Sequence, residues 1–155
     1  MKKYAKILVA ILLISLLATA LFACINPDSD SQGKMTLVVL DGDNTKEYSV
    51  KLEDVTDISS KGLVAILDHL KAKGELTYSS NDSGYGAYLT QVNGLSEGNG
   101  IYVYVYTDVQ ADFDVSQYAS QITYKDKSYT NSGVGISQMS VKDGCTIVIT
   151  TISFG

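Results

Sequence analysis

The sequence predicts an α+β fold in which one amphipathic helix lies across one face of a mixed β-sheet. Short segments rich in β-branched and aromatic residues recur along the chain, separated by turns of Asp, Asn and Gly. Residues 59–74 instead place apolar side chains at helical spacing. The order is therefore a hairpin, a helix and then several strands, which is typical of an α+β protein.

The first hairpin is predicted from two extended segments joined by turn residues. Residues 34–40 (KMTLVVL) are apolar and β-branched, and residues 47–52 alternate so that Tyr48, Val50 and Leu52 share one face. The tetrapeptide between them, DGDN at 41–44, carries the residues that favour turns. We expect two antiparallel strands here.

The single helix is predicted from its end signals and its apolar stripe. Ser59 or Ser60 can serve as the N-cap, basic residues occupy the last turn, and Gly74 follows as the end signal. The stripe that would face the sheet consists of Leu63, Ile66, Leu67 and Leu70.

The remaining strands complete a sheet of the β-grasp kind. We expect a short strand at 76–78, a loop, a strand at 87–92 that ends in an Asn93-Gly94 turn, and a strand within 101–109. Residues 110–132 are polar and irregular, with strand character at 121–124. Residues 134–141, a turn at 142–144 and a strand at 145–154 close the chain.

The N-terminus predicts export and lipid anchoring. Lys2, Lys3 and Lys6 precede an apolar run over residues 7–23, the pattern of an export signal, although an uncleaved transmembrane helix is the alternative. Residues 21–24 (LFAC) resemble the lipobox of bacterial lipoproteins, in which Cys24 would be acylated after cleavage. We therefore expect a signal peptide at 1–23, a lipidated Cys24 with a flexible tether at 24–33, and a domain at 34–155 held at the extracytoplasmic face of a bacterial membrane.

Composition excludes some classes of function. The chain holds 12 basic residues, all lysines, of which three lie in the signal peptide, and the nine that remain face 17 acidic residues. A mature net charge of −8 and the absence of arginine disfavour nucleic-acid and phosphate binding. With Cys24 acylated, Cys145 is the one remaining thiol, so no intrachain disulfide is expected.

Neither a metal site nor a catalytic centre is predicted. Asp41 and Asp43 begin like a calcium loop, but Lys46 and Leu52 stand at its sixth and twelfth positions, so a plain turn is favoured. Residues 108–114 (DVQADFD) are taken as a solvated acidic connector, with a weak cation site as the alternative. His69 and Cys145 would have to meet in the fold to form a catalytic pair, and we expect a non-enzyme with no required cofactor.

Tyrosines supply the candidate binding residues. Alternation places Tyr102, Tyr104 and Tyr106 on one face of their strand, with Tyr85 and Tyr88 nearby in sequence. They predict an aromatic platform for a flat ligand, a sugar or a partner protein. The alternative is that the tyrosines only cover a half-exposed sheet face, because tyrosine is a common strand residue.

These motifs resemble those of the transcobalamin-like C-terminal domain family. Residues 88–94 (YLTQVNG) resemble an aromatic-aliphatic-Thr-x-Val/Ile-Asn-Gly motif, and residues 133–144 resemble the closing segment of that family. The chain departs from the family in lacking Trp, in having Thr107-Asp108 at an expected second turn, and in carrying Cys145 at a position that is often Asp. Residues 110–132 look like an insertion.

The resemblance implies a lid-like domain that contacts a corrinoid, and here no helical barrel accompanies it. We therefore expect a membrane-anchored, non-catalytic binding module whose ligand is a corrinoid-like small molecule or whose partner is a surface protein or transporter. The expected ligand-binding residues are Tyr88, Asn93, Tyr102, Tyr104 and Tyr106. The alternatives are a structural or adhesion module that contacts protein or glycan through the tyrosine face, and a calcium-stabilised module.

Overall fold

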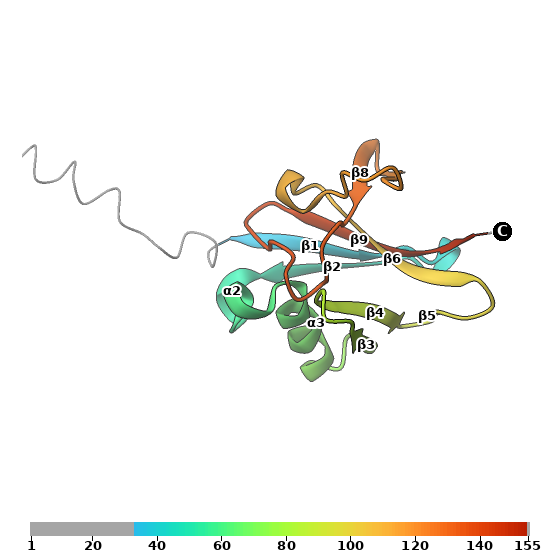
Figure 1. The fold of residues 1–155 in the computed structure, drawn as a ribbon. Coiled ribbons are helices and arrows are strands. Elements are labelled where there is room, and N and C mark those ends of the chain that lie inside the picture. The colour runs from blue at the N-terminus through green and yellow to red at the C-terminus, as the bar shows by residue number, and fades with distance from the viewer. Residues whose placement is uncertain (1–32, 155) are drawn as a thin grey trace, which may run out of the picture.

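A computed structural model describes residues 33–154, which form a layered α+β fold (Figure 1). The predicted signal peptide, Cys24 and all of the tether except Gly33 lie outside the described residues. Within 33–154, no helix is both long and apolar enough to cross a membrane.

A six-stranded mixed sheet forms the middle layer, in the order β2-β1-β9-β6-β8-β7. The central strands β1 and β9 run parallel, and the other neighbours are antiparallel. This arrangement, with one long helix on one face, confirms the predicted β-grasp-like fold. The strands are β1 Lys34–Val39, β2 Lys46–Lys51, β6 Ile101–Thr107, β7 Gln121–Tyr124, β8 Lys127–Asn131 and β9 Thr146–Ser153.

The first hairpin forms as predicted. β1 and β2 pair from Lys34–Lys51 to Val39–Lys46, and the turn contains the 3₁₀ helix η3 at Gly42–Asn44. A second 3₁₀ turn, η4 at Leu52–Asp54, follows β2 and buries Leu52 in the core.

The predicted helix is divided in two, and its predicted cap is wrong. α2 covers Ile58–Lys61 and α3 covers Leu63–Ala72, with Gly62 between them at φ +54°. A Cβ at Gly62 would lie 2.6 Å from the Met139 carbonyl oxygen, so neither space nor backbone conformation suits a larger residue. Ser59 and Ser60 therefore lie inside α2 and do not cap the long helix, whose Leu63 amide donates to the Ile136 carbonyl.

The end of α3 matches the prediction from Gly74. Gly74 has φ +72°, its amide donates to the Lys71 carbonyl, and the Glu75 amide donates to the Leu70 carbonyl. This pair of hydrogen bonds is a Schellman motif, which glycine favours because it adopts a left-handed conformation at little cost.

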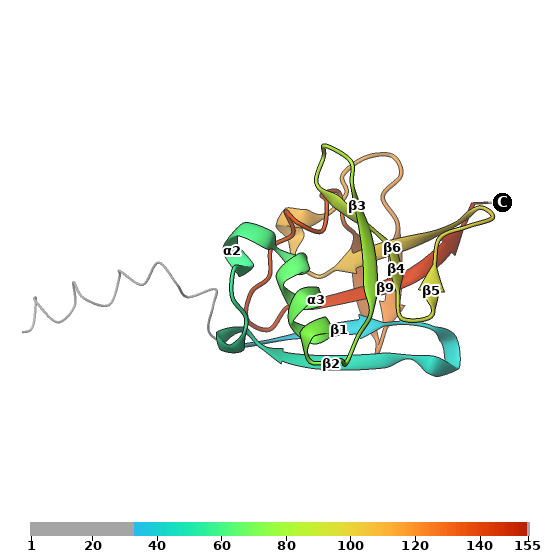
Figure 2. The same ribbon diagram turned by 90° about the horizontal axis from the view of Figure 1, so that it is seen from below.

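A small three-stranded sheet lies beside α3 on the same side of the large sheet (Figures 1 and 2). It consists of β3 Tyr78–Asp82, β4 Ala87–Val92 and β5 Leu95–Ser96. β4 has the predicted bounds, whereas β3 begins at Tyr78 and continues through residues that were expected to form a loop. The pairing of β3 with β4 shifts at Ser79/Ser80, and this irregularity turns both Leu89 and Val92 into the core.

The main core lies between the six-stranded sheet and the layer of α3 and β3–β5. It contains the whole predicted helix stripe together with side chains from β1, β4 and β9. Its fully buried members include Leu37, Leu52, Leu63, Ile66, Leu67, Leu89, Val92, Ile147 and Ile149.

The opposite face of the large sheet is partly covered by the β7–β8 hairpin (Figure 1). A second, smaller core forms there from Val38, Tyr106, Tyr129 and Val148. At the tip of the hairpin, Tyr124 and Lys125 bond to Glu47 of β2, although β2 and β7 are at opposite edges of the sheet order. The sheet is therefore strongly curved, and the β7–β8 hairpin folds back across it.

The closing segment before β9 is irregular. Residues 134–141, which were grouped with the closing strands, contain no strand. The turn at 142–144 forms as predicted, and in it the Cys145 amide donates to the Lys142 carbonyl. Ile136, Met139 and Val141 of this segment are buried, so it caps the core next to Gly62.

Candidate functional site

Strand β6 divides its side chains between two faces. Val103 and Val105 face the main core, and the three tyrosines face the side of the β7–β8 hairpin. Tyr102 is 46% exposed, whereas Tyr106 is only 2% exposed because it belongs to the second core. The hydroxyl of Tyr106 lies 3.3 Å from Ser120 Oγ. The expected platform of three tyrosines is therefore open at Tyr102 and closed at Tyr106.

The open part of this face is an aromatic patch formed by Tyr102, Tyr104 and Phe154. The ring of Phe154 contacts both tyrosines edge to face, with centroid distances of 5.7 Å to Tyr102 and 5.9 Å to Tyr104. Phe154 is 61% exposed. Because each ring touches the next, the patch is contiguous and differs from single exposed aromatic residues, which are common on protein surfaces.

Sequence analysis did not include Phe154 in the site. Its amide donates to the Gly100 carbonyl, which continues the antiparallel pairing of β9 with β6 beyond the strand end. The length of the apolar C-terminal strand could have indicated this position. If that strand pairs antiparallel with β6, its last residues lie next to the first residues of β6, near Tyr102.

Tyr104 lies in the middle of the β6 tyrosines. Burial, with smaller contributions from Tyr106, Asp114 and Tyr102, raises the pKa of Tyr104 above its ordinary value. Its hydroxyl is therefore neutral at physiological pH and can both donate and accept a hydrogen bond. The patch offers apolar ring edges with polar tips and does not present a charge.

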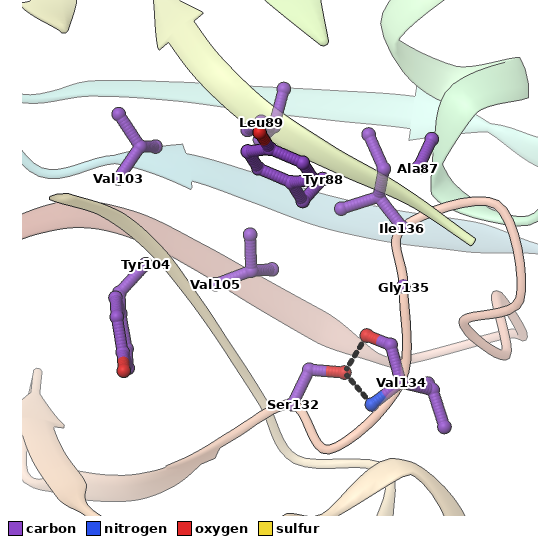
Figure 3. Close-up of a pocket in the computed structure, with 10 residues that line it drawn as sticks. All are labelled: Ala87, Tyr88, Leu89, Val103, Tyr104, Val105, Ser132, Val134, Gly135 and Ile136. Carbon is purple, nitrogen blue, oxygen red and sulfur yellow. Dashed lines mark hydrogen bonds between the residues drawn. The ribbon is translucent and has the colours of Figure 1, made fainter. Parts of the chain in front are cut away.

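A pocket of about 140 Å³ lies on the other side of β6, between β6, β4 and residues 132–136 (Figure 3). Its side chains are apolar or hydroxylated, and none is charged. Figure 3 shows the Val105 side chain pointing toward β4 and the Tyr104 ring pointing away on the opposite side of β6. The lining residues are Ala87, Tyr88, Leu89, Val103, Tyr104, Val105, Ser132, Val134, Gly135 and Ile136.

Residues 132–136 hold β4 and β6 in place at the closed end of this pocket. The Ser132 amide donates to the Val105 carbonyl, and the Ile136 amide donates to the Ala87 carbonyl. Gly135 approaches the backbone of Gly86 so closely that a Cβ would lie 2.8 Å from the Gly86 Cα. The absence of a Cβ at Gly135 and Gly86 therefore permits this close contact.

Tyr88 and Asn93 occupy different environments. Tyr88 lines the pocket and is 42% exposed. Asn93 has φ +49°, its Oδ1 accepts from the Thr77 amide, and its Nδ2 donates to the Tyr48 hydroxyl at 3.0 Å. The side chain of Asn93 therefore uses its polar atoms to fix the turn between β4 and β5 against the first hairpin.

The acidic connector uses its carboxylates within the fold. Asp108 accepts from Lys127 and from the Thr146 amide, and Asp112 is buried with both oxygens bonded to Ser140. Asp114 accepts from Asn131 and from the Ser116 amide, and bonding to Ser116 is the main cause that lowers its pKa. Across residues 33–154, no three His, Cys, Asp or Glu side chains group in a way that could hold a metal ion.

His69 and Cys145 belong to separate parts of the fold. His69 lies on α3 beside a hollow that Asp54 and Asp68 also line. Cys145 is buried before β9, where burial raises the pKa of its thiol, and its sulfur accepts from the Lys142 amide at 3.5 Å. A buried neutral thiol is a weak nucleophile, so this cysteine functions as a core residue.

Comparisons with known proteins show a similarity of fold but no family. No family model matches the sequence, and no curated protein matches it. The fold is similar to the crystal structure of a candidate metal-binding protein from Ruminococcus gnavus, with a TM-score of 0.49 and 15% sequence identity. That match covers 80% of this chain and 100% of the other chain.

Proposed function

We propose that this protein is a non-catalytic binding module, anchored through Cys24 to the extracytoplasmic face of a bacterial membrane, which contacts its ligand through the aromatic patch. The observation that supports this proposal is the contiguity of Tyr102, Tyr104 and Phe154 on an open sheet face. Aromatic rings with polar tips give large, rigid contact areas at a low cost in conformational entropy.

The ligand that suits this surface is flat and amphipathic, because the patch has no enclosing walls. A corrinoid-like molecule, which the family resemblance implies, fits that description. The patch would cover one side of such a ring, and a partner protein would cover the other. The tyrosine hydroxyls would bond to amide groups at the ring periphery, and this contact needs no charged side chain.

The direct test measures the binding of cobalamin to the purified full-length chain in detergent by isothermal titration calorimetry. We expect saturable binding, and we expect the triple substitution Tyr102→Ser, Tyr104→Ser and Phe154→Ser to weaken it at least about tenfold. The matched control replaces Tyr85 and Tyr118 by Ser, since these tyrosines are 87% and 75% exposed and lie outside the patch. Equal losses in both variants would contradict a specific role for the patch.

The anchoring half of the proposal has its own test. We expect mass spectrometry of the native membrane fraction to find a diacylglycerol-modified Cys24, and Cys24→Ser to release the chain from the membrane. An unmodified Cys24 in that fraction would contradict lipid anchoring.

A structural or adhesion role is the second candidate, because an open, contiguous aromatic surface also suits a protein or glycan partner. It would be favoured if cobalamin does not bind while the triple substitution reduces attachment of cells to a protein or glycan surface. The calcium-stabilised alternative has less support, since the carboxylates of Asp108, Asp112 and Asp114 already accept hydrogen bonds within the fold. A rise in the melting temperature of the chain on addition of calcium would support this alternative.

A further inference from the structure

The pocket beside β4 contains an unpaired part of the edge of β6. The pairing of β6 with β9 is flanked by hydrogen bonds from the Asp108 amide to the Thr146 carbonyl and from the Phe154 amide to the Gly100 carbonyl. Antiparallel ladders alternate, so the even-numbered residues of β6 bond to β9 and the odd-numbered residues direct their amides and carbonyls to the opposite edge.

Neighbouring segments occupy that opposite edge only at its two ends. Ile101 exchanges hydrogen bonds with Gly98 at one end. At the other end, Thr107 pairs with β8 and the Val105 carbonyl accepts from Ser132. Between them, within residues 33–154, the amide and carbonyl of Val103 and the amide of Val105 have no hydrogen-bonding partner. β6 therefore presents two free donors, the amides of Val103 and Val105, and one free acceptor, the Val103 carbonyl, at the pocket, where a further strand would pair.

The pocket next to these groups has the size of one side chain. A dry cavity of about 150 Å³ accommodates benzene, so about 140 Å³ suffices for one aromatic or branched aliphatic side chain. Leu89, Val105 and Ile136 supply apolar walls, and the lining carries no charge. A free main-chain donor and acceptor beside one apolar pocket are the two elements of recognition by strand addition, in which the main chain supplies affinity and the pocket supplies selectivity.

We propose that the edge of β6 at Val103 binds an extended segment of a partner protein as an added strand, with one uncharged, apolar side chain in the β4–β6 pocket. The added strand takes the place that β8 leaves when the chain turns away after Ser132. This site borders on Tyr104 of the aromatic patch, but its walls from Val103 and Val105 lie on the opposite face of β6 from the tyrosine rings. It does not depend on the cobalamin proposal.

The test uses the full-length chain in detergent and a capped heptapeptide of alternating serine and valine with phenylalanine at the centre. A library of displayed nine-residue peptides extends the search. We expect saturable peptide binding, at least tenfold slower hydrogen exchange at the Val103 amide in the complex, and loss of binding when the peptide amide that faces the Val103 carbonyl is methylated. Methylation of the next amide, which faces away, is the matched control.

Two variants separate the edge from the pocket. Val103→Pro removes the free amide of Val103, and Val105→Phe fills the pocket while leaving the edge free. Each should weaken peptide binding at least tenfold. If Val103→Pro fails to fold, the Val105→Phe variant and the methylated peptides still test the proposal.

Three results with peptides would overturn the proposal. They are the absence of saturable binding by the heptapeptide and by every library peptide, equal binding to a folded Val105→Phe chain, and equal sensitivity to methylation at either peptide amide. Protection of the Val103 amide that rises with protein concentration in the absence of peptide would also overturn it, because the edge would then pair with a second copy.

Discussion

The two faces of the six-stranded sheet are covered in different ways. On the helix side, α3 and the small sheet enclose a continuous apolar core that includes Leu37, Leu67 and Ile147. On the other side, the smaller core at the two-stranded hairpin contains only four buried side chains, two of which are tyrosines, and one of them, Tyr129, belongs to the hairpin itself. The difference indicates that the helix side provides most of the stability, whereas the hairpin side leaves half of β6 exposed for the aromatic patch.

Polar contacts hold the hairpin in position around the second core. Tyr106 bonds to Ser120, Tyr124 bonds to Glu47, and Lys127 bonds to Asp108. Such contacts fix geometry but add little net stability where they are exposed to water. The hairpin should therefore open locally at a lower free energy than the helix side, and substitutions on the two faces can test this expectation.

The largest effect is expected on the helix side from Leu67→Ala. Leu67 is fully buried in the main core, so removal of its side chain leaves a cavity. We expect a loss of about 2–5 kcal/mol in the free energy of unfolding, measured by urea denaturation. Fluorescence and circular dichroism should report one transition. A loss confined to the helix signal would contradict a shared core.

A smaller effect is expected on the other side from Tyr106→Phe, which keeps the ring and removes the hydroxyl that bonds to Ser120. The expected loss is about 0.5–1.5 kcal/mol. Hydrogen exchange of residues 121–131 should accelerate more than exchange in α3. Equal acceleration in both regions would show that the two faces unfold as one unit, contrary to the comparison above.

The smallest effect is expected from Glu47→Gln, which weakens the link between β2 and the hairpin tip. Hydrogen bonds from Lys125 and then Tyr124 hold the pKa of Glu47 below its ordinary value. A carboxyl with a lower pKa in the folded state contributes stability above its unfolded pKa and loses that contribution as pH falls through its folded pKa.

The link should therefore be intact at neutral pH and weaken as the pH falls through the lowered pKa of Glu47, below the ordinary pKa of a glutamate. We expect the amide chemical shifts of residues 122–128 to titrate in that range and the titration to disappear in Glu47→Gln. Glu53→Gln is the matched control, because Glu53 pairs with Lys51 at the surface and does not bond to the hairpin. A titration that persists in Glu47→Gln would assign the effect to another carboxyl.

Much of the fold could be predicted because it follows local rules. The first hairpin, β4, β6 and the Schellman end of α3 lie where alternation, turn residues and Gly74 indicated. The break at Gly62 could not be predicted in this way, since it depends on the close approach of Met139, which is distant in sequence. The irregular pairing of β3 with β4 could not be predicted either. Period-two alternation places Leu89 and Val92 on opposite faces of the strand, whereas both side chains are buried.

The candidate site was predicted in part. Alternation correctly grouped Tyr102 and Tyr104 on one face of β6, but it could not show that the β7–β8 hairpin would fold back and bury Tyr106. Asn93 was identified as a turn residue, and its contact with Tyr48 depends on the packing of two hairpins. Phe154 joins the patch because β9 pairs with β6 in antiparallel register.

The sequence by itself determined the fold class, the main strands, the end of the helix and the apolar stripe, because these depend on side chains a few residues apart. Only the tertiary structure decided which tyrosines are exposed, that Phe154 completes the patch, and that Val103 is left without a main-chain partner beside a pocket. These features arise where segments distant in sequence meet or separate. The physical reason is that exposure and strand pairing depend on what the rest of the chain places against a residue.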